Sequence, residues 1–409
     1  MTEITQTQFF GDFTRLQSRV DIRKRLDPAF YAKEIEQIFR RVWLPVASVT
    51  DLPQDNCYVV TDVPPLKSSL IVARGPDGVV RAFHNMCRHR GTRLARDQKG
   101  CRKAFSCSFH GWTYATDGRL IGVTDRTQFP ADMDATTLGL IPLHTEVWED
   151  YVFVNFAAEP PMSMKQWMGK FYYQYPAFFS NRQRIASYHI VVDANWNVAV
   201  NSFSEGYHAA YVHRKTVPDY QGGKQNPLRH RAYLEITEHH GRYSAQANPN
   251  RRATPVEKIA YERGRPLYPA FPPFSEAGLP LPAGVNASRN PNWGFDVFEV
   301  FPAMVILIGG HWHANLRFWP IAPDKSDIRV EFFAYKAGTV GDHLAHAYFR
   351  TRLREVFRED VGTMEQITSA LKSGVMQDIV LSKQEYLLQQ HYAVADELVP
   401  PEAAKDNQS

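Results

Sequence analysis

Two short segments of the sequence each offer one thiolate and one imidazole to a metal. The first pair is Cys87 with His89, the second is Cys107 with His110, and residues 90–106 separate the two. Two soft sulfur ligands and two imidazoles suit a transition metal, so zinc and an iron–sulfur cluster are the candidates. Zinc fingers usually place cysteine close to cysteine and histidine close to histidine. A mixed pair in each segment instead favours a [2Fe–2S] cluster in which one iron takes both thiolates and the other takes both imidazoles.

A second group of potential metal ligands lies further along the chain, at Glu205, His208 and His213. On a regular helix Glu205 and His208 share a face, so their side chains can form a hydrogen bond. His208 and His213 are about 140° apart on such a helix, and they converge only if the helix is bulged, is unwound or ends before His213. The spacing therefore fits a metal-binding pair, with two buried core histidines as the alternative interpretation.

A third ligand for this pair has to come from a distant segment, and Asp360 is the best candidate. It lies in an acid-rich part of the predicted C-terminal helix, with Glu359 and Glu365 as the next candidates. Two histidines and one carboxylate form the open site of non-haem Fe(II) oxygenases, which leaves positions for oxygen. Taken alone, the acidic cluster also fits a solvated helix face.

Two hairpins flank the predicted cluster ligands. The turn 75–78 leads into the first ligand segment, and the turn 116–118 follows the second. Gly91 and Gly111 come close after the ligand histidines, where the backbone must bend tightly around inorganic sulfide. The pattern predicts a small β domain, from about Val42 to Asn155, that carries the ligand loops at its hairpin tips.

The rest of the chain predicts a mixture of helices and strands. We expect a helix that begins at the cap Asp27-Pro28, and a helix or interrupted helix at about 195–213. The other expected elements are strands at 188–192 and 233–236, a long hairpin over 298–333 that turns at 322–326, and helices at about 342–373 and 378–390. Residues 264–294 are proline-rich and predict a lid or binding loop, with disorder as the alternative.

Composition excludes several classes of protein. The net charge of +4 over 409 residues is small, and no block of Lys and Arg stands out, so we expect no nucleic-acid partner. No apolar run approaches the length of a membrane span, and the N-terminus lacks a signal-peptide pattern. Of four cysteines, two belong to the predicted cluster. We expect Cys57 to be a buried small side chain and Cys101 a loop thiol, which favours a reducing cytoplasm over a disulfide scaffold.

The motifs together resemble one known family. Cys-x-His-Arg-Gly with Cys-x2-His-Gly-Trp, followed by Asn-x3-Glu-x2-His-x4-His and a distant Glu-Asp, resembles the α subunit of Rieske non-haem iron oxygenases, the aromatic-ring-hydroxylating dioxygenases and monooxygenases. The resemblance covers about residues 40–395. It implies an α+β protein with an all-β Rieske domain at 42–158. It also implies a catalytic domain at 159–409 with a helix-grip fold, an antiparallel sheet wrapped on a long helix. An N-terminal helical segment at 1–41 would pack on the catalytic domain.

The resemblance also assigns roles to the candidate residues. Cys87, His89, Cys107 and His110 would hold the [2Fe–2S] cluster, and His208, His213 and Asp360 would hold a mononuclear Fe(II).

Two further residues receive roles by the same resemblance. Glu205 matches an acid, usually Asp, that connects an iron-ligand histidine to a cluster histidine of a neighbouring subunit in a trimer. Asn201 matches a polar residue near the iron, with structural packing as the alternative.

The same comparison separates this chain from the respiratory electron carriers that use a Rieske cluster. Those carriers have two further cysteines that form a disulfide across the ligand loops, and here Thr92 and Phe109 stand at those positions. The carriers are also membrane-anchored and lack a second iron site. A non-enzymatic electron carrier is therefore the less favoured interpretation.

The resemblance implies partners as well. No Gly-x-Gly-x-x-Gly fingerprint is present, so electrons would come from a separate flavin reductase, a ferredoxin or both. The assembly would be a homotrimer, with or without a small β subunit.

The substrate is predicted less sharply. The expected pocket walls are strands near 301–319, the helix around 203–211 and the proline-rich loop, which are aromatic and apolar. No arginine is clearly placed to bind a carboxylate, and Arg289 and Arg317 are the two candidates. We expect a bulky, mostly apolar ring compound. The alternative is a quaternary-ammonium compound, or an N- or O-methyl compound, that is hydroxylated towards dealkylation.

Overall fold

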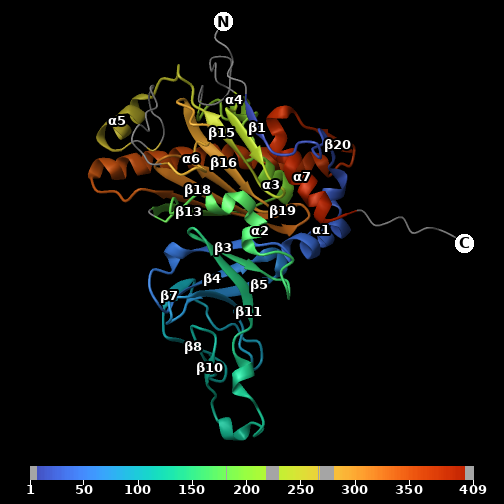
Figure 1. Ribbon diagram of the computed structural model, residues 1–409, viewed down its shortest axis with the longest axis vertical. Coiled ribbons are helices and arrows are strands. Elements are labelled where there is room, and N and C mark those ends of the chain that lie inside the picture. Colours follow the sequence, from blue (N-terminus) through green and yellow to red (C-terminus); the bar gives the residue numbers. More distant parts are fainter. Residues whose placement is uncertain (1–6, 181, 218–229, 266, 268–280, 401–409) are drawn as a thin grey trace, which may run out of the picture. The chain divides into compact units, whose positions relative to one another are not determined.

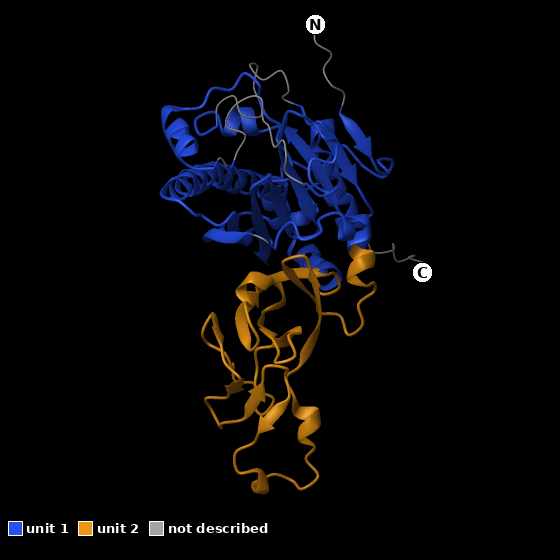
Figure 2. Ribbon diagram, turned by 60° about the vertical axis from the view of Figure 1, so that its left-hand side comes forward, with its two compact units in different colours: residues 1–38, 168–409 blue, residues 39–167 orange. Residues whose placement is uncertain are grey.

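The computed structural model describes residues 7–180, 182–217, 230–265, 267 and 281–400. The chain divides into two compact units (Figure 2). One unit is Phe39–Trp167, and the other combines Met1–Ile38 with Met168–Ser409. The N-terminal segment therefore belongs to the same unit as the C-terminal half of the chain.

The unit Phe39–Trp167 is built on β-strands, as the turn pattern predicts (Figure 1). Its larger sheet contains, in spatial order, β3 (Leu44–Ser48), β12 (Tyr151–Asn155), β11 (Pro142–Trp148), β6 (Val80–His84), β5 (Ser68–Arg74), β4 (Cys57–Val63) and β7 (Lys99–Cys101). Its smaller sheet contains β10 (Leu120–Gly122), β9 (Thr113–Ala115) and β8 (Ala104–Ser106). Both predicted hairpins are present, because β5 pairs with β6 and β9 with β10. Their turns contain Gly78 and Gly118, each at positive φ.

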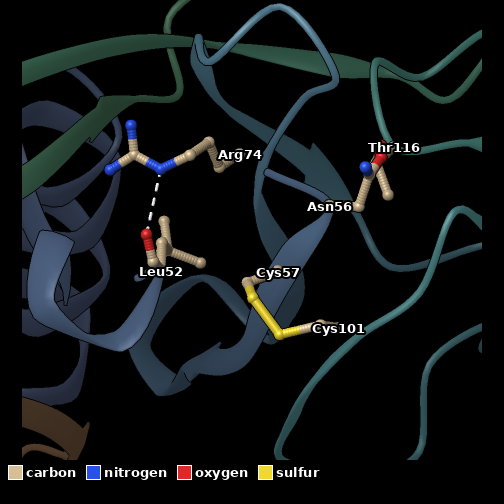
Figure 3. The surroundings of a disulfide bond; sticks show 6 residues. All are labelled: Leu52, Asn56, Cys57, Arg74, Cys101 and Thr116. Carbon is tan, nitrogen blue, oxygen red and sulfur yellow. Dashed lines mark hydrogen bonds between the residues drawn. A yellow bond between two sulfur atoms is a disulfide. The ribbon is translucent and has the colours of Figure 1, made fainter. Parts of the chain in front are cut away.

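A disulfide joins Cys57 in β4 to Cys101 in β7 (Figure 3). The two residues are direct partners in the antiparallel pairing, and their Cα atoms are 3.8 Å apart. Two hydrogen bonds order the same region, from Arg74 Nε to the Leu52 carbonyl oxygen and from the Thr116 hydroxyl to the Asn56 side-chain oxygen.

The prediction that Cys57 and Cys101 are unpaired was therefore wrong, although Cys57 is buried as expected. The argument from cysteine usage for a reducing compartment fails with it, and a cytoplasmic location stays a prediction.

The unit that contains the C-terminal half is organised by a sheet of eight strands. Their spatial order is β1 (Gln8–Phe10), β14 (Tyr233–Ile236), β15 (Gly241–Gln246), β16 (Trp293–Val300), β17 (Met304–Ile308), β18 (Trp312–Ala322), β19 (Lys325–Ala334) and β13 (Gln183–Val192). All neighbours are antiparallel except β1 and β14. The region predicted as one hairpin over 298–333 contains parts of four strands, and only its turn between β18 and β19 lies where predicted. A separate ribbon pairs β2 (Arg19–Asp21) with β20 (Asp378–Val380).

Seven α-helices occur in the described part of the chain. They are α1 (Pro28–Glu34), α2 (Met164–Met168), α3 (Trp196–Asn201), α4 (Ala209–Val212), α5 (Pro255–Arg263), α6 (Val340–Leu371) and α7 (Tyr386–Leu398). The Asp27 carboxylate accepts a hydrogen bond from the amide of Phe30, which confirms the predicted cap of α1. The helix predicted at 378–390 was partly wrong, because β20 occupies its start and α7 begins at Tyr386. No described helix is long and apolar enough to cross a bilayer.

The long helix α6 lies against the sheet (Figure 1). Its buried residues recur every three or four positions and include Phe349 and Phe357. The Phe349 ring contacts Trp312 of β18 and Phe332 of β19, and Phe357 also contacts Phe332. This packing fixes the position of Asp360, one turn further along α6, and it agrees with the expected helix-grip arrangement.

Candidate metal centres

The two cluster-ligand loops have the same backbone geometry. In the first loop the Cys87 amide donates to the Thr92 carbonyl at 2.8 Å, and the Gly91 amide donates to the Cys87 carbonyl at 2.9 Å. The second loop repeats both bonds, between Cys107 and Trp112 at 2.8 Å and between Gly111 and Cys107 at 2.9 Å. Both glycines have positive φ, +78° and +72°, which side chains rarely tolerate.

The rings of the two predicted cluster histidines contact each other and neighbouring aromatic side chains. The rings of His89 and His110 have centroids 4.7 Å apart. The His89 ring also stacks on Trp112 at 4.9 Å with an interplanar angle of 11°. Its Nδ1 is buried and has no hydrogen-bond partner among the described residues. Since a buried imidazole nitrogen normally has a partner, this atom fits a metal ligand.

The two thiols are buried and surrounded by hydrogen-bond donors. The Tyr114 hydroxyl lies 3.3 Å from the sulfur of Cys87. Burial raises the pKa of the Cys107 thiol, but several hydrogen bonds, first among them those from the amides of Phe109 and His110, together outweigh it and bring that pKa below its usual value. Amides that stabilise a thiolate also suit a sulfur bound to iron. The four residues therefore fit the predicted cluster.

The predicted helix around the histidine pair is interrupted, and its second part ends before His213, which is one of the conditions that the spacing sets. α3 ends at Asn201, and α4 begins after His208. The hydroxyls of Ser202 and Ser204 donate to carbonyl oxygens one turn back, at Val198 and Val200, and so compete with the helix ladder where it ends.

The Glu205 carboxylate supports the restart of the helix. It accepts hydrogen bonds from the amides of Tyr207 and His208, the second at 3.1 Å. α4 ends at Val212, before His213, and this allows His208 and His213 to face each other.

Three side-chain atoms converge next to this break. The Nε2 atoms of His208 and His213 are 3.1 Å apart, and the nearer carboxylate oxygen of Asp360 lies 3.4 Å from the first and 3.2 Å from the second. When two ligand atoms each form a bond of about 2.1 Å to one metal ion, they lie about 3.0 Å apart if the ligand–metal–ligand angle is a right angle. They lie about 3.4 Å apart if that angle is tetrahedral. The triangle therefore fits three ligands on one side of a single metal ion.

Each histidine of this group is oriented by a second carboxylate. Nδ1 of His208 donates to Glu205, and Nδ1 of His213 donates to Glu359 at 2.9 Å. The Thr216 hydroxyl donates to the same Glu359 oxygen at 2.6 Å. Such bonds fix the tautomer, so that Nε2 presents its lone pair to the metal position. Glu359, a candidate third ligand by sequence, thus orients His213, and Asp360 takes the position among the donor atoms.

The electrostatics of the pair reflect these three acids. Burial opposes protonation of His208, but hydrogen bonds to Asp360 and Glu205 outweigh it and raise the pKa of His208 to about 10. The pKa of His213 is raised in the same way by Asp360 and Glu359, against the effect of burial. The site is therefore built to stabilise positive charge, which a metal cation supplies as well as a proton does.

A cavity adjoins the three donor atoms, and its wall is mostly apolar. Its polar members include Glu205, His208, His213, Asp360 and Arg352. Its apolar members include Phe203, Ala209, Val217, Phe295, Val297, Leu307, Leu353, Val356 and Phe357. The predicted contribution from the region 203–211 is thus present, and Leu307 comes from the predicted strand region 301–319. Residues 266 and 268–280 of the proline-rich loop lie outside the described residues, and the described residues of that loop do not line the cavity.

Some predicted residues lie elsewhere. Asn201 is buried near Tyr392 of α7, and it is not among the described residues of the cavity wall. A structural role fits this position better than a place beside the metal. Arg289 bonds to backbone carbonyls near its own loop, and Arg317 pairs with Glu331 at 2.9 Å.

Arg352, which the sequence did not single out, is instead the arginine among the described residues of the cavity wall. Only its spacing of eight residues before Asp360 could have indicated it.

Comparison with known protein families matches both units. Residues 42–136 match the Rieske [2Fe–2S] domain, and residues 179–400 match the ring-hydroxylating alpha subunit catalytic domain. The chain belongs to the ring-hydroxylating α-subunit family. It therefore carries a [2Fe–2S] domain together with a catalytic domain that binds mononuclear iron in this family, and the fold class expected from the sequence is confirmed.

Relatives in this family act on different substrates. A glycine betaine monooxygenase oxygenase subunit from Chromohalobacter salexigens is 33% identical over 187 residues, which cover 46% of this chain and 41% of the relative. A biphenyl 2,3-dioxygenase α subunit from Rhodococcus jostii is 32% identical over 197 residues, 47% of this chain and 42% of the relative. The matched region therefore spans less than half of the length of these relatives.

Solved structures share the fold over nearly the whole chain. A quaternary ammonium Rieske monooxygenase superposes with a TM-score of 0.74 at 20% identity and covers 94% of this chain and 96% of its own. Naphthalene 1,2-dioxygenase from Rhodococcus sp. superposes with a TM-score of 0.73 at 19% identity and covers 94% and 95%.

Proposed function

We propose that this protein is the oxygenase component of a multicomponent Rieske non-haem iron oxygenase. It would use O2, and electrons from a separate NAD(P)H-dependent reductase or ferredoxin, to hydroxylate a bulky, mostly apolar ring substrate. One observation carries the proposal: the donor atoms of His208, His213 and Asp360 converge at the edge of an aromatic-lined cavity. The family membership supports it.

The residues of the chain have distinct parts in this reaction. His208, His213 and Asp360 would hold the mononuclear iron, and Cys87, His89, Cys107 and His110 would hold the cluster. When bound, the iron supplies O2 activation and the cluster supplies single electrons.

The protein itself positions and protects the reacting groups. Glu205 and Glu359 hold the two histidines in the ligating tautomer. Aromatic side chains such as Phe203 and Phe357 orient a ring against the metal site and exclude water.

Glu205 has a second proposed role, in electron delivery. Its carboxylate is bonded to His208 on one side, and we infer that it forms the bridge through which an electron passes from the cluster, by way of His110 of the partner subunit in a homotrimer, to the iron site. Glu in place of the usual Asp lengthens this side chain by one methylene. Support comes from the family resemblance and from one solved relative, a quaternary ammonium Rieske monooxygenase whose structure gives insights into inter-subunit electron transfer.

A second candidate is a monooxygenase that hydroxylates a quaternary-ammonium or methyl-bearing substrate towards dealkylation. Support comes from the relatives, among which are glycine betaine monooxygenase subunits and a quaternary ammonium monooxygenase of the same fold. Catabolism of aromatic compounds is the role that the first candidate implies, and the biphenyl and benzene dioxygenase subunits support it.

The test is substrate-stimulated O2 uptake with a surrogate ferredoxin and reductase. The panel contains neutral aromatic hydrocarbons, aromatic carboxylates and quaternary ammonium compounds, and products are analysed for oxygen incorporated from labelled O2. Hydroxylated ring product supports the first candidate, and release of a dealkylated amine supports the second. Protein that holds both metals, accepts electrons and oxidises none of the panel would contradict the proposal and favour an electron carrier.

A further inference from the structure

A second apolar pocket, the outer pocket, lies between the sheet and α6 (Figure 1). Its floor consists of two residue pairs from β13 and β19, Tyr188 with Val330 and Ile190 with Ile328. Residues that are directly opposite, and residues two positions apart, share one face of a sheet, so the four side chains point the same way. β13 is the last strand of the sheet, and Ile190 is 41% exposed. The outer pocket therefore opens at this edge.

The outer pocket and the cavity beside the metal ligands, the metal cavity, use neighbouring faces of α6. Each face follows the spacing i, i+3, i+4 and i+7. The outer pocket takes Arg354, Phe357, Arg358 and Val361. The metal cavity takes Leu353, Val356, Phe357 and Asp360, together with Arg352. On a regular helix the two sets of four are rotated by about 100° from each other, and Phe357 belongs to both.

Two aromatic side chains separate the outer pocket from the metal cavity. Phe203 and Phe357 line both spaces. Their rings contact each other edge to face, with centroids 5.0 Å apart and an interplanar angle of 81°. Phe203 lies between α3 and α4, outside both helices, and its ring also contacts Phe318 of β18. The partition between the two spaces is therefore this pair of rings.

The metal cavity by itself is too small for a ring. Its volume is about 80 Å³, whereas an apolar cavity of about 150 Å³ is known to hold one benzene molecule. The outer pocket has a volume of about 280 Å³. Joined, the two reach the range of about 300–1,000 Å³ that is typical of small-molecule sites. A ring at the metal ligands therefore needs more space than the metal cavity offers, and the outer pocket adjoins it across Phe203 and Phe357.

The outer pocket suits an uncharged occupant. Arg354 and Arg358 each pair with Glu355, at 2.8 Å and 3.1 Å, and their side chains are 48% and 72% exposed. Their charges therefore lie at the surface, around an interior that is mainly aromatic and aliphatic. No acidic side chain is among the described residues that line the pocket, so the pocket itself offers no anion to a quaternary ammonium group.

We propose that the outer pocket is the second half of the substrate site and that the substrate is an elongated, uncharged apolar compound. One ring would lie at the metal ligands, and a second ring or an alkyl chain would extend past Phe203 and Phe357 into the outer pocket. A change of rotamer at Phe203, which lies outside both helices, would join the two spaces. The inference rests on the proposed oxygenase function and names its substrate class.

The experiment uses the alkylbenzenes from toluene to n-hexylbenzene. Their Kd for the iron-loaded protein is measured without O2, from the loss of vapour above the solution, and kcat/KM is measured with the surrogate reductase. Each methylene that enters an apolar site raises affinity about fourfold. We therefore expect Kd to fall, and kcat/KM to rise, about threefold to fourfold for each methylene of the series.

Ile190→Trp fills the outer pocket from its edge. Toluene should keep its wild-type Kd within about threefold, whereas the total gain from toluene to n-hexylbenzene should fall at least about tenfold. Val330→Phe fills the pocket from the sheet and should also reduce the gain. Val191→Trp is the matched control, because residue 191 is 50% exposed and lies on the opposite face of β13. It should retain the whole gain.

The binding measurement separates this inference from the oxygenase proposal, and iron content with cluster absorption checks that each variant is folded. An equal gain in the wild-type protein, Ile190→Trp and Val330→Phe would overturn the inference, as would the absence of any gain in the wild-type protein. Affinity that depends on the outer pocket, without oxidation of any alkylbenzene, would contradict the proposed reaction but keep the pocket. Oxidation of toluene with no gain along the series would keep the reaction and overturn the pocket.

Discussion

The two candidate metal centres of this protein are specified in different ways. The cluster loops are short and contiguous, and each reproduces the same two backbone hydrogen bonds around its cysteine. The catalytic site instead joins a broken helix at 202–208 to Asp360 on α6, which packing of Phe357 against the sheet holds in place. Local motifs therefore suffice for the first centre, whereas the second depends on tertiary structure. Substitutions should therefore be able to disrupt one centre and leave the other intact.

The largest expected effect comes from Asp360→Ala. Loss of one of three ligands should release the mononuclear iron, while the cluster keeps its visible absorption, because its ligands lie in the other unit. Iron analysis together with the absorption spectrum measures both centres in one sample. Glu359→Gln is the matched control from the adjacent position. It should keep iron but bind it about 10- to 100-fold more weakly, since it only orients His213. Iron retained by Asp360→Ala would place the third ligand elsewhere.

Glu205→Gln should give the next largest effect. Both metals should remain bound, because the amide can still form a hydrogen bond to His208. The amide carries no charge, however, and so it cannot stabilise the imidazole or relay an electron as the carboxylate does. We expect turnover with the reductase to fall by at least about 10- to 100-fold. Stopped-flow reduction of the cluster should be unchanged, and subsequent reoxidation in the presence of substrate should be slowed. Turnover of Glu205→Gln at the wild-type rate would contradict the bridging role of Glu205.

The cluster site is expected to depend on the Cys57–Cys101 disulfide only through the stability of the folded protein. Its sequence separation of 44 residues implies a stabilisation of up to about 4 kcal/mol by the entropy of loop closure. The double variant Cys57→Ser with Cys101→Ser should therefore unfold at lower denaturant concentration but retain the cluster spectrum before the transition. Thiol titration of the unfolded wild-type chain, after removal of iron, checks that two cysteines are oxidised. Four reactive thiols would contradict the disulfide.

The smallest expected effects come from substitutions of the glycines in the two cluster-ligand loops. Gly91→Ala should lower the free energy of unfolding by about 1–2 kcal/mol, because the positive φ is the only penalty. The added Cβ would meet nothing within 4 Å. Gly111→Ala should cost more, since its Cβ would lie 2.7 Å from the Thr124 hydroxyl. Adding Thr124→Ala should reduce the cost of Gly111→Ala to that of Gly91→Ala. Thermal unfolding followed at the cluster absorption provides the measurement. Equal costs for the two single variants would show that Thr124 moves aside freely.

The difference between the two centres also explains what could be predicted from the sequence. The cluster ligands, both hairpins and the end of the helix before His213 follow from local spacing and turn residues. The Cys57–Cys101 disulfide could not be predicted, because it depends on the pairing of β4 with β7, and β7 is a three-residue strand without a hydrophobic pattern. Arg352 was missed for a related reason. Its partner Glu257 comes from a distant segment, and the packing of α5 on α6 brings the two together.

The metal content of the purified protein tests the central claim most directly. Iron and acid-labile sulfide are measured per chain, together with zinc and the electron paramagnetic resonance spectrum of the reduced protein. A Rieske cluster plus a mononuclear site gives about three iron atoms and about two sulfides per chain, with the low average g value of a histidine-ligated cluster. About two iron atoms with two sulfides, even after reconstitution with Fe(II), would contradict the second centre. Zinc without sulfide would contradict both.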